Sequence, residues 1–202
     1  MRKIIVAEFM TLDGIIQAPG GNDEDAEGAG DGFAHGGWAW PYWHDDIDAY
    51  NEAAMSEFDT CLLGRKTWQA FAATFEPLAD DAPQSAGLST MRKYVVSNTL
   101  SSADAWRNST LISGASGDVM TQVRALKEQP GKNILMNGSS QLIHSLAQRD
   151  LIDAYHLLVF PIVLGSGKKV FADDAQITLQ LIEARPIPSG VTFLRYAVER
   201  PA

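Results

Sequence analysis

Residues 62–68 read LLGRKTW and mark a junction between two structural elements. The apolar run that closes at Gly64 is typical of a buried strand, and the residues after it favour a helix that begins at Arg65. The first N–H groups of such a helix have no partners within it, and its dipole favours an anion at that end. Gly64 also lets a ligand come close to the backbone.

This junction has the chemistry of a phosphate site. The side chains that add charge and a hydroxyl donor there are Arg65, Lys66 and Thr67. A strand ended by glycine, followed by a helix with ordinary surface cations, explains the same pattern equally well. The junction alone therefore leaves both interpretations open.

Polar residues follow two further predicted strands in the same way. The strand over 133–137 runs into a Gly-Ser-Ser turn that suits a pyrophosphate or, alternatively, only caps a helix. The strand over 93–97 is followed by short polar residues that suit a phosphate or ribose, or only a turn. The residues are Gly138, Ser139 and Ser140 at the first junction and Ser97 and Asn98 at the second. Together, three such junctions predict one extended nucleotide site at the carboxyl edge of a sheet.

Strand and helix patterns alternate along most of the chain. Strands are predicted at 2–9, 59–64, 93–97, 110–113, 133–137, 152–163, 176–184 and 191–198, and helices at 45–57, 65–73, 116–128 and after residue 138. Residues 76–90 are predicted to be an irregular connection. This order predicts one α/β domain over residues 1–202, with a mostly parallel central sheet and an antiparallel C-terminal hairpin at its edge.

Composition limits the function classes. The chain has 202 residues and a net charge of −9, which disfavours a nucleic-acid partner. No apolar run approaches the ~20 residues of a membrane helix, so a cytoplasmic protein is expected. Its one cysteine, Cys61, lies in an apolar run and is predicted to be buried and inert. The histidines show no metal-ligand spacing, and no metal is expected.

Residues 18–43 form a long segment that is rich in glycine and acids at its start and in aromatics at its end. Such a loop inside a compact domain is usually functional or disordered. Aromatic side chains usually pack over other groups, which argues against simple disorder here. The aromatic residues predicted to line or cover a substrate are Trp38, Trp40 and Trp43. A contact between two copies of the chain is the alternative.

The stretches IIVAEFMTLDG, LLGRKTW, KYVVS, ILMNGSSQLIHSL and LLVFPIVLGSGKKVF together resemble the bacterial bifunctional deaminase-reductase C-terminal domain family. That family is of the riboflavin-biosynthesis reductase type and shares the dihydrofolate-reductase fold, and the resemblance runs from residue 2 to residue 198. Its reference member uses NADPH to reduce the ribosyl group of 5-amino-6-(5-phosphoribosylamino)uracil. The resemblance therefore implies an NADPH-dependent oxidoreductase that acts on a small molecule and forms a homodimer.

The resemblance also implies roles for individual residues. Cofactor-binding residues would be Gly64, Arg65, Lys66 and Thr67 at the phosphates, Ser97 and Asn98 near the adenosine 2′-phosphate, and Gly138, Ser139 and Ser140 at the pyrophosphate. Dihydrofolate reductases often have a cis bond between two glycines at the last turn. Since Ser139 replaces the second glycine here, and a non-proline cis bond costs ~3 kcal/mol, a trans bond is expected.

Two carboxylates are the catalytic candidates. Dihydrofolate reductases carry a buried acid on the helix before their Gly-Arg-x-Thr motif, and the same spacing counted back from Gly64 leads to Asp48. Asp13 would lie beside the nicotinamide. A carboxylate there could bind the substrate or help to supply a proton. Equally, Asp48 fits a solvated first helical turn and Asp13 fits a turn.

The predicted function is thus reduction by NADPH, either of the riboflavin intermediate or of a diverged small heterocyclic or carbonyl substrate. The chain shows no H-x-E…C-x-x-C zinc deaminase pattern, so a stand-alone reductase is expected. Dihydrofolate reduction is one alternative. A non-catalytic nucleotide-binding or oligomeric structural protein is the other.

Overall fold

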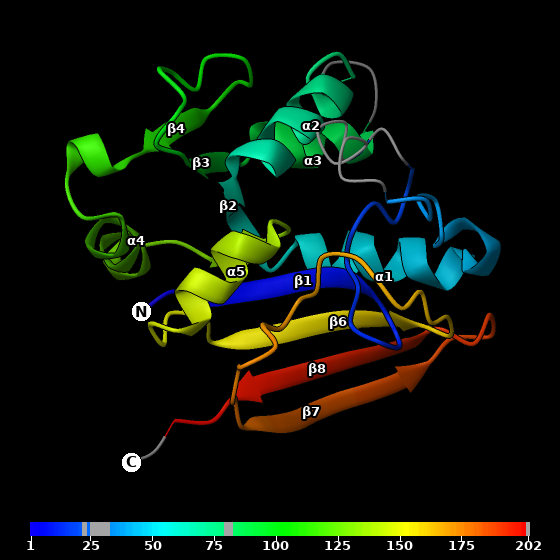
Figure 1. Ribbon diagram of the computed structural model, residues 1–202. Coiled ribbons are helices and arrows are strands. Elements are labelled where there is room, and N and C mark those ends of the chain that lie inside the picture. Colours follow the sequence, from blue (N-terminus) through cyan, green and yellow to red (C-terminus); the bar gives the residue numbers. More distant parts are fainter. Residues whose placement is uncertain (22–23, 25–32, 79–82, 201–202) are drawn as a thin grey trace.

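The computed structural model describes residues 1–21, 24, 33–78 and 83–200, whose strands form one eight-stranded sheet (Figure 1). The strands are β1 (Ile4–Thr11), β2 (Phe58–Gly64), β3 (Arg92–Val96), β4 (Ser109–Ile112), β5 (Asn133–Met136), β6 (Ala154–Phe160), β7 (Leu179–Pro186) and β8 (Thr192–Val198). The α-helices are α1 (Asp45–Met55), α2 (Arg65–Phe75), α3 (Pro83–Thr90), α4 (Val119–Glu128) and α5 (Ser140–Ala147).

The strand order is β4-β3-β2-β5-β1-β6-β8-β7. All pairs from β4 to β6 are parallel, whereas β8 is antiparallel to both β6 and β7. The hairpin β7–β8 therefore forms one edge of the sheet, as Figure 1 shows in orange and red. This topology confirms the predicted fold class.

The prediction of an irregular connection over 76–90 is wrong for its second half, where α3 lies. Pro83 is the first residue of α3. Proline is tolerated at that position because its missing N–H would have no partner within the helix, and its fixed φ suits a first turn. The two prolines and several small residues of 76–90 are equally typical of an irregular connection, so the local pattern did not reveal the helix. Residues 79–82 lie outside the described part of the chain.

Both faces of the sheet are covered by apolar side chains. On one face, Leu142 and Leu146 of α5 and Val123 of α4 pack with β1 and β5 residues. On the other face, Trp68 and Ala72 of α2 pack against β2. A third cluster joins Ile47 of α1 to the aromatic residues of β6 and β8. None of the helices in the described ranges is long and apolar enough to cross a membrane.

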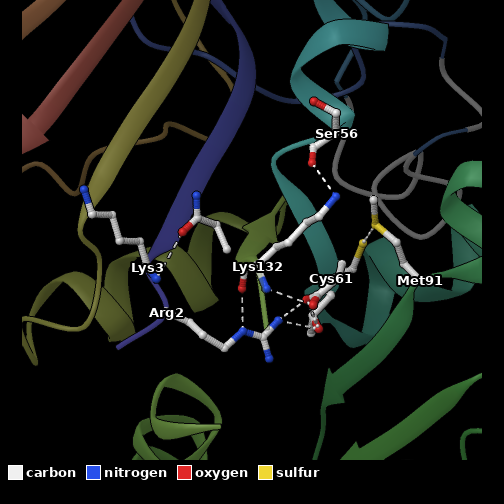
Figure 2. Close-up of polar contacts among 9 residues, drawn as sticks. Arg2, Lys3, Ser56, Cys61, Met91 and Lys132 are labelled. Carbon is white, nitrogen blue, oxygen red and sulfur yellow. Dashed lines mark hydrogen bonds and ion pairs between the residues drawn. The ribbon is translucent and has the colours of Figure 1, made fainter. Parts of the chain in front are cut away.

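A buried arginine ties the start of β1 to its neighbours at the amino edge of the sheet (Figure 2). Arg2 donates to the carboxylate of Asp59 and to the hydroxyl of Thr60, the latter at 2.7 Å. Its Nε also donates to the carbonyl of Lys132, whose own N–H donates to Asp59 at 2.9 Å. This network holds β1, β2 and the turn before β5 in register, away from the carboxyl edge where the predicted site lies.

Cys61 is buried in β2, as predicted. Its Sγ lies 3.6 Å from Sδ of Met91. Burial raises the pKa of the Cys61 thiol to about 12, against the opposing effect of Lys93. A thiol that stays protonated is a poor nucleophile, which is consistent with an inert core residue.

Candidate functional site

A cleft opens at the carboxyl edge of the sheet because two neighbouring strands have different lengths. The pairing of β1 with β5 stops at Val6 and Met136, whereas β1 continues along β6 to Thr11. Beyond that point the β5 side of β1 is bridged by polar contacts. Asn137 donates its Nδ2 to the carbonyl of Ala7 at 2.7 Å, and the Gly138 N–H donates to the Glu8 carboxyl group.

The cleft has a volume of about 900 Å³. All of the residues predicted to bind a cofactor line it, and together they are called the polar wall: Gly64, Arg65, Lys66, Thr67, Ser97, Asn98, Gly138, Ser139 and Ser140. They come from the ends of β3, β2 and β5, which are adjacent in the sheet. Three junctions that lie far apart in the sequence thus share one cavity.

Two helices begin at the polar wall. Gly64, which has no side chain, is the N-cap of α2, and Ser139 is the N-cap of α5, where its side chain makes no capping hydrogen bond. The first N–H groups of a helix need partners, and its dipole favours an anion there. Arg65 stands at the first position of α2, where its Nη1 donates to Oε1 of Gln69 at 3.0 Å. The wall therefore combines backbone donors with positive charge.

Close packing explains the glycines of the polar wall. A Cβ at Gly64 would lie 2.4 Å from Oγ of Ser139, and one at Gly138 would lie 2.6 Å from Oγ1 of Thr67. The two turns interlock, so neither position has room for a side chain. Gly138 also has a φ of 57°, which favours glycine.

The Gly138–Ser139 peptide bond is cis, so the expectation of a trans bond is wrong. That expectation rested on the missing second glycine and on the cost of a non-proline cis bond. The cis bond leads into Ser139, which stands at the N-cap position of α5 without a side-chain capping hydrogen bond.

The residues after β3 build a turn at the edge of the cleft. The Ser97 hydroxyl accepts the backbone N–H groups of Thr99 and Leu100, both at 3.1 Å. The Asn98 side chain accepts the N–H of Gly114 at 2.9 Å. The turn-forming alternative is therefore seen in the structure, and the same residues also line the cleft.

Glu8 is a site residue that the sequence argument missed. It is 8% exposed, lies in β1 and lines the cleft beside Gly138. Burial raises the pKa of Glu8 to about 8, against the opposing hydrogen bond from the Gly138 amide. The sequence does carry a signal for this residue, since Glu8 is the single acid in the apolar strand IIVAEFMT. A charged side chain is rarely buried without a partner or a functional reason. Glu8 can hold or release a proton near neutral pH.

The far end of the cleft lies between α1 and the sheet, and sequence reasoning missed its polar groups too. His156 of β6 pairs in register with Ala7 of β1, so both side chains lie on the same face of the sheet. Tyr50 of α1 and His156 both line the cleft. Burial, and then the positive charge of Arg195, lower the pKa of His156 to about 4. Nothing in the local sequence marks these two residues as neighbours.

Neither predicted catalytic acid lines the cleft. Asp48 is exposed on the first turn of α1 and accepts the indole N–H of Trp43 at 3.0 Å. Asp13 accepts the hydroxyl of Thr11 and the N–H of Gly165, at 2.6 and 2.7 Å. Burial alone would raise the pKa of Asp13, but these hydrogen bonds outweigh it and the pKa is lowered. The hydrogen bonds of both residues agree with the turn and first-turn alternatives, and a catalytic role for either acid stays a prediction.

The structure shows where the three tryptophans that were predicted to line or cover a substrate lie. Trp38 is buried in the core, where its indole N–H donates to the Gln17 carbonyl at 2.7 Å. Trp40 is 58% exposed, and Trp43 lies edge-on to Phe9 with ring centroids 5.6 Å apart. None of the three tryptophans lines the cleft. The sequence does not show toward which part of the molecule each ring points. Residues 22–23 and 25–32 of the same segment lie outside the described part of the chain.

Within the described ranges, no three His, Cys, Asp or Glu side chains gather as metal ligands. The arrangement offers backbone donors and cations at the polar wall, a titratable carboxyl group at the centre and a largely apolar end below α1. Such a site can hold an elongated anionic ligand beside a small molecule.

The chain is similar over most of its length to a family model and to two Bacillus subtilis proteins. Residues 2–193 match the family model described as the RibD C-terminal domain. Uncharacterized protein YyaP of Bacillus subtilis (strain 168) is 28% identical over 200 residues, which cover 96% of this chain and 94% of that protein. Uncharacterized protein YwjB of the same organism is 24% identical over 174 residues, which cover 84% of this chain and 83% of that protein.

Solved structures show the same fold. A protein attributed to riboflavin biosynthesis from Shewanella sp. PV-4 has a TM-score of 0.68 at 21% identity, over 98% of this chain and 99% of that chain. A pyrimidine reductase-like protein from Corynebacterium diphtheriae has a TM-score of 0.63 at 13% identity, over 99% and 93%. Dihydrofolate reductase from Enterococcus faecalis, complexed with NADP(H) and RAB-propyl, has a TM-score of 0.60 at 10% identity, over 98% and 97%.

Proposed function

The chain belongs to the RibD C-terminal domain family, and from this premise we propose that it is an NADPH-dependent reductase of a small molecule. The observation that carries the proposal is the convergence of the whole polar wall on one cleft. Reductase-like relatives of the same fold support it. One of them was solved with NADP(H) bound.

The polar wall fits a dinucleotide. Uncapped N-termini of two helices and a pair of interlocked glycine turns make a cradle for phosphate groups. Arg65 and Lys66 add the positive charge that favours the additional phosphate of NADPH over NADH. The cleft volume of about 900 Å³ leaves space for a small substrate beside the cofactor.

The order of strands gives the proposed orientation. Along the sheet, the site residues follow the sequence Ser97 at β3, Arg65 at β2, Gly138 at β5 and Glu8 at β1. We assign the adenosine end to the β3 side and the reactive end to the gap between β5 and β1. This assignment places Glu8 and the space under α1 next to the reacting atoms.

The chemistry needs no nucleophile. When bound, NADPH supplies a hydride. The substrate also takes up a proton, and we propose that Glu8 supplies it as a general acid and regains it from solvent. The polar wall positions the cofactor, and the apolar residues below α1 exclude water.

A screen of NADPH oxidation tests the reaction and its alternatives. It would include the riboflavin intermediate, dihydrofolate and small carbonyl compounds. Oxidation of NADPH with dihydrofolate alone would favour dihydrofolate reduction. Tight NADPH binding without turnover of any compound would favour a binding protein. The homodimer stays a prediction, which light scattering of the purified protein would test.

Replacing Arg65 with alanine is expected to weaken NADPH binding by roughly ten- to a hundredfold. A charge-assisted hydrogen bond to a phosphate contributes about 1.5–3 kcal/mol, and each 1.4 kcal/mol is about tenfold in affinity. The measurement is a titration of NADPH fluorescence at fixed salt concentration.

Arg124→Ala is the matched control, because Arg124 is an exposed arginine of α4 that does not line the cleft. This variant is expected to bind NADPH like the wild type. Equal affinities in the Arg65 and Arg124 variants would contradict the phosphate assignment.

A further inference from the structure

The segment after β1 forms part of the wall of the cleft. Residues 15–20 follow the turn at the end of β1 and are called the strap. The strap residues that line the cleft are Ile16, Gln17, Ala18 and Pro19. Glu8 and Phe9 of β1 line the same cleft, so the strap shares it with the reactive end assigned above.

One side of the strap is bonded to a segment that also contacts α5. The N–H of Ile16 donates to the carbonyl of Lys168 at 2.9 Å, and the N–H of Lys168 donates to Oε1 of Gln17 at 3.1 Å. The carbonyl of Lys169 lies 3.1 Å from Nε2 of His144 in α5. The strap is thereby joined to the α5 side of the cleft as well as to β1.

The other side of the strap is held by a single turn, residues 37–40. Four consecutive strap carbonyls each accept one N–H group of this turn, two from the backbone and two from indole rings. The pairs are Trp38 Nε1 with Gln17 at 2.7 Å, Gly37 N with Ala18 at 2.9 Å, Ala39 N with Pro19 at 3.1 Å and Trp40 Nε1 with Gly20 at 2.6 Å. These bonds together are called the clasp.

Ala18 shows that the clasp determines the shape of the strap. Its φ is 50°, in the left-handed region that residues other than glycine rarely adopt, and it is 6% exposed. Such a conformation costs energy and persists only where its surroundings fix it. The clasp bonds at Gln17, Ala18 and Pro19 lie on and beside this residue, so they hold the backbone in this conformation.

The two tryptophans of the clasp share a role although their surroundings differ. Trp38 is buried and packs edge-on against Phe160 of β6, with ring centroids 5.2 Å apart, whereas Trp40 is 58% exposed. Both indole N–H groups nevertheless donate to the strap. Trp43 of the same segment donates to Asp48 of α1 instead, so binding to the strap is specific to the first two rings.

On the premise of the reductase function above, we propose that Trp38 and Trp40 are positioning residues, which hold the strap at the distance from β1 that hydride transfer needs. They act through the backbone of the strap, since neither of them lines the cleft. Hydride transfer depends on reacting atoms that are held close together, and a displacement of about 1 Å caused far from the chemistry can cost about a hundredfold in rate. A strap bonded on both sides supplies a wall of constant position.

The ligand-free protein tests whether the bonds of the clasp act together. In a ¹H–¹⁵N spectrum of tryptophan-labelled protein, each indole N–H is assigned by its Trp→Phe variant, and its exchange with deuterium is timed. Trp40→Phe removes one donor at an exposed position, so the fold is expected to persist. Exchange at Trp38 is expected to be roughly two- to tenfold faster in this variant, as the loss of one neutral hydrogen bond predicts.

Trp43→Phe is the matched control. It removes an indole N–H from the same segment, but that group donates to Asp48 and not to the strap. Exchange at Trp38 in this variant is expected to equal that of the wild type. The clasp is overturned if Trp40→Phe leaves exchange at Trp38 unchanged, or if Trp43→Phe speeds it as much.

Cofactor binding tests whether the strap belongs to the site. With NADP⁺ at about a hundred times its Kd, exchange at Trp38 and Trp40 is expected to slow by roughly ten- to a hundredfold, because a ligand that contacts the strap opposes its opening. Trp43 in the same sample is the internal reference and is expected to exchange at the same rate with and without NADP⁺. Equal effects at all three indoles, or none at Trp38 and Trp40, would overturn the positioning role.

Steady-state kinetics separate positioning from a merely structural role. With a substrate found in the screen above, Trp40→Phe is expected to lower kcat roughly two- to tenfold. The affinity for NADPH, which the polar wall sets, is expected to stay close to that of the wild type. A variant that only weakens the fold would lower the midpoint of urea unfolding and leave kcat unchanged, and that result would overturn the positioning role.

The same measurements separate this proposal from the proposed function. If NADPH fluorescence shows binding but exchange at Trp38 and Trp40 does not respond to NADP⁺, only the positioning role is wrong. If NADPH does not bind, the reductase proposal is wrong and the positioning role falls with it. The effect of Trp40→Phe on Trp38 needs no cofactor and decides the clasp in either case.

Discussion

Glu8→Gln is expected to lower turnover by roughly 100- to 10,000-fold while leaving NADPH affinity close to that of the wild type. Glutamine keeps the volume of the side chain and can still accept the Gly138 N–H, but it has no proton to transfer. The measurement is the rate of NADPH oxidation with a substrate found in the screen described above. Glu128→Gln, at the exposed end of α4, is the matched control and is expected to be fully active.

The pH profile separates proton transfer from a merely structural role. Because the pKa of Glu8 is raised to about 8 by burial, the protonated form persists up to that pH. Wild-type turnover is therefore expected to fall as the pH rises through about 8, and the residual activity of Glu8→Gln is expected to lack this step. A step at the same pH in both proteins would assign it to another group.

A stability measurement checks the same titration without any substrate. The pKa of Glu8 is raised from 4.5 to about 8 on folding, so the folded state binds this proton more tightly than the unfolded state. The free energy of unfolding is then expected to fall as the pH rises through this window, relative to Glu8→Gln. Parallel curves for the two proteins would contradict a buried, titrating Glu8.

Asp153→Ala is expected to give the largest loss of stability, about 3–5 kcal/mol, because it leaves a buried lysine without its counter-ion. Nζ of Lys127 lies 2.6 Å from Oδ2 of Asp153, and the two side chains are 7% and 13% exposed. The same carboxylate accepts the N–H of Ile4 at 2.8 Å and pairs with Arg200 at 2.9 Å. Asp153 therefore joins α4, the start of β1 and the C-terminal segment.

Urea unfolding of Asp153→Ala and Asp173→Ala compares two lysine–aspartate pairs of similar length. Asp173 lies 2.7 Å from Nζ of Lys169, but its side chain is 87% exposed, so the loss of this pair is expected to leave the unfolding midpoint nearly unchanged. Asp153→Asn keeps an acceptor for Ile4 and is expected to lose less stability than Asp153→Ala. Similar midpoints for the two alanine variants would show that the buried pair adds nothing.

The polar wall was predictable because its signals are local. Each junction combines the end of a strand, a small residue and the start of a helix within a few positions, as in Gly64 to Thr67. Parallel strands then bring their carboxyl ends to one edge whatever the details of the sheet. Local reasoning could not place Asp48, which is exposed on α1, because a one-residue change in helix register decides whether an acid faces a cleft or solvent.

The sequence by itself determined the order of strands and helices, the three polar junctions after strands and the family resemblance, since all of these depend on residues that are neighbours in the chain. The tertiary structure decided which side chains occupy the reactive and substrate ends of the cleft. Glu8 can accept the Gly138 N–H because β1 extends beyond the last residue of β5 with which it pairs. The side chain of His156 lies on the same face of the sheet as that of Ala7 because of the register between β1 and β6. Such contacts depend on strand length and register across more than a hundred residues, and no local pattern encodes either.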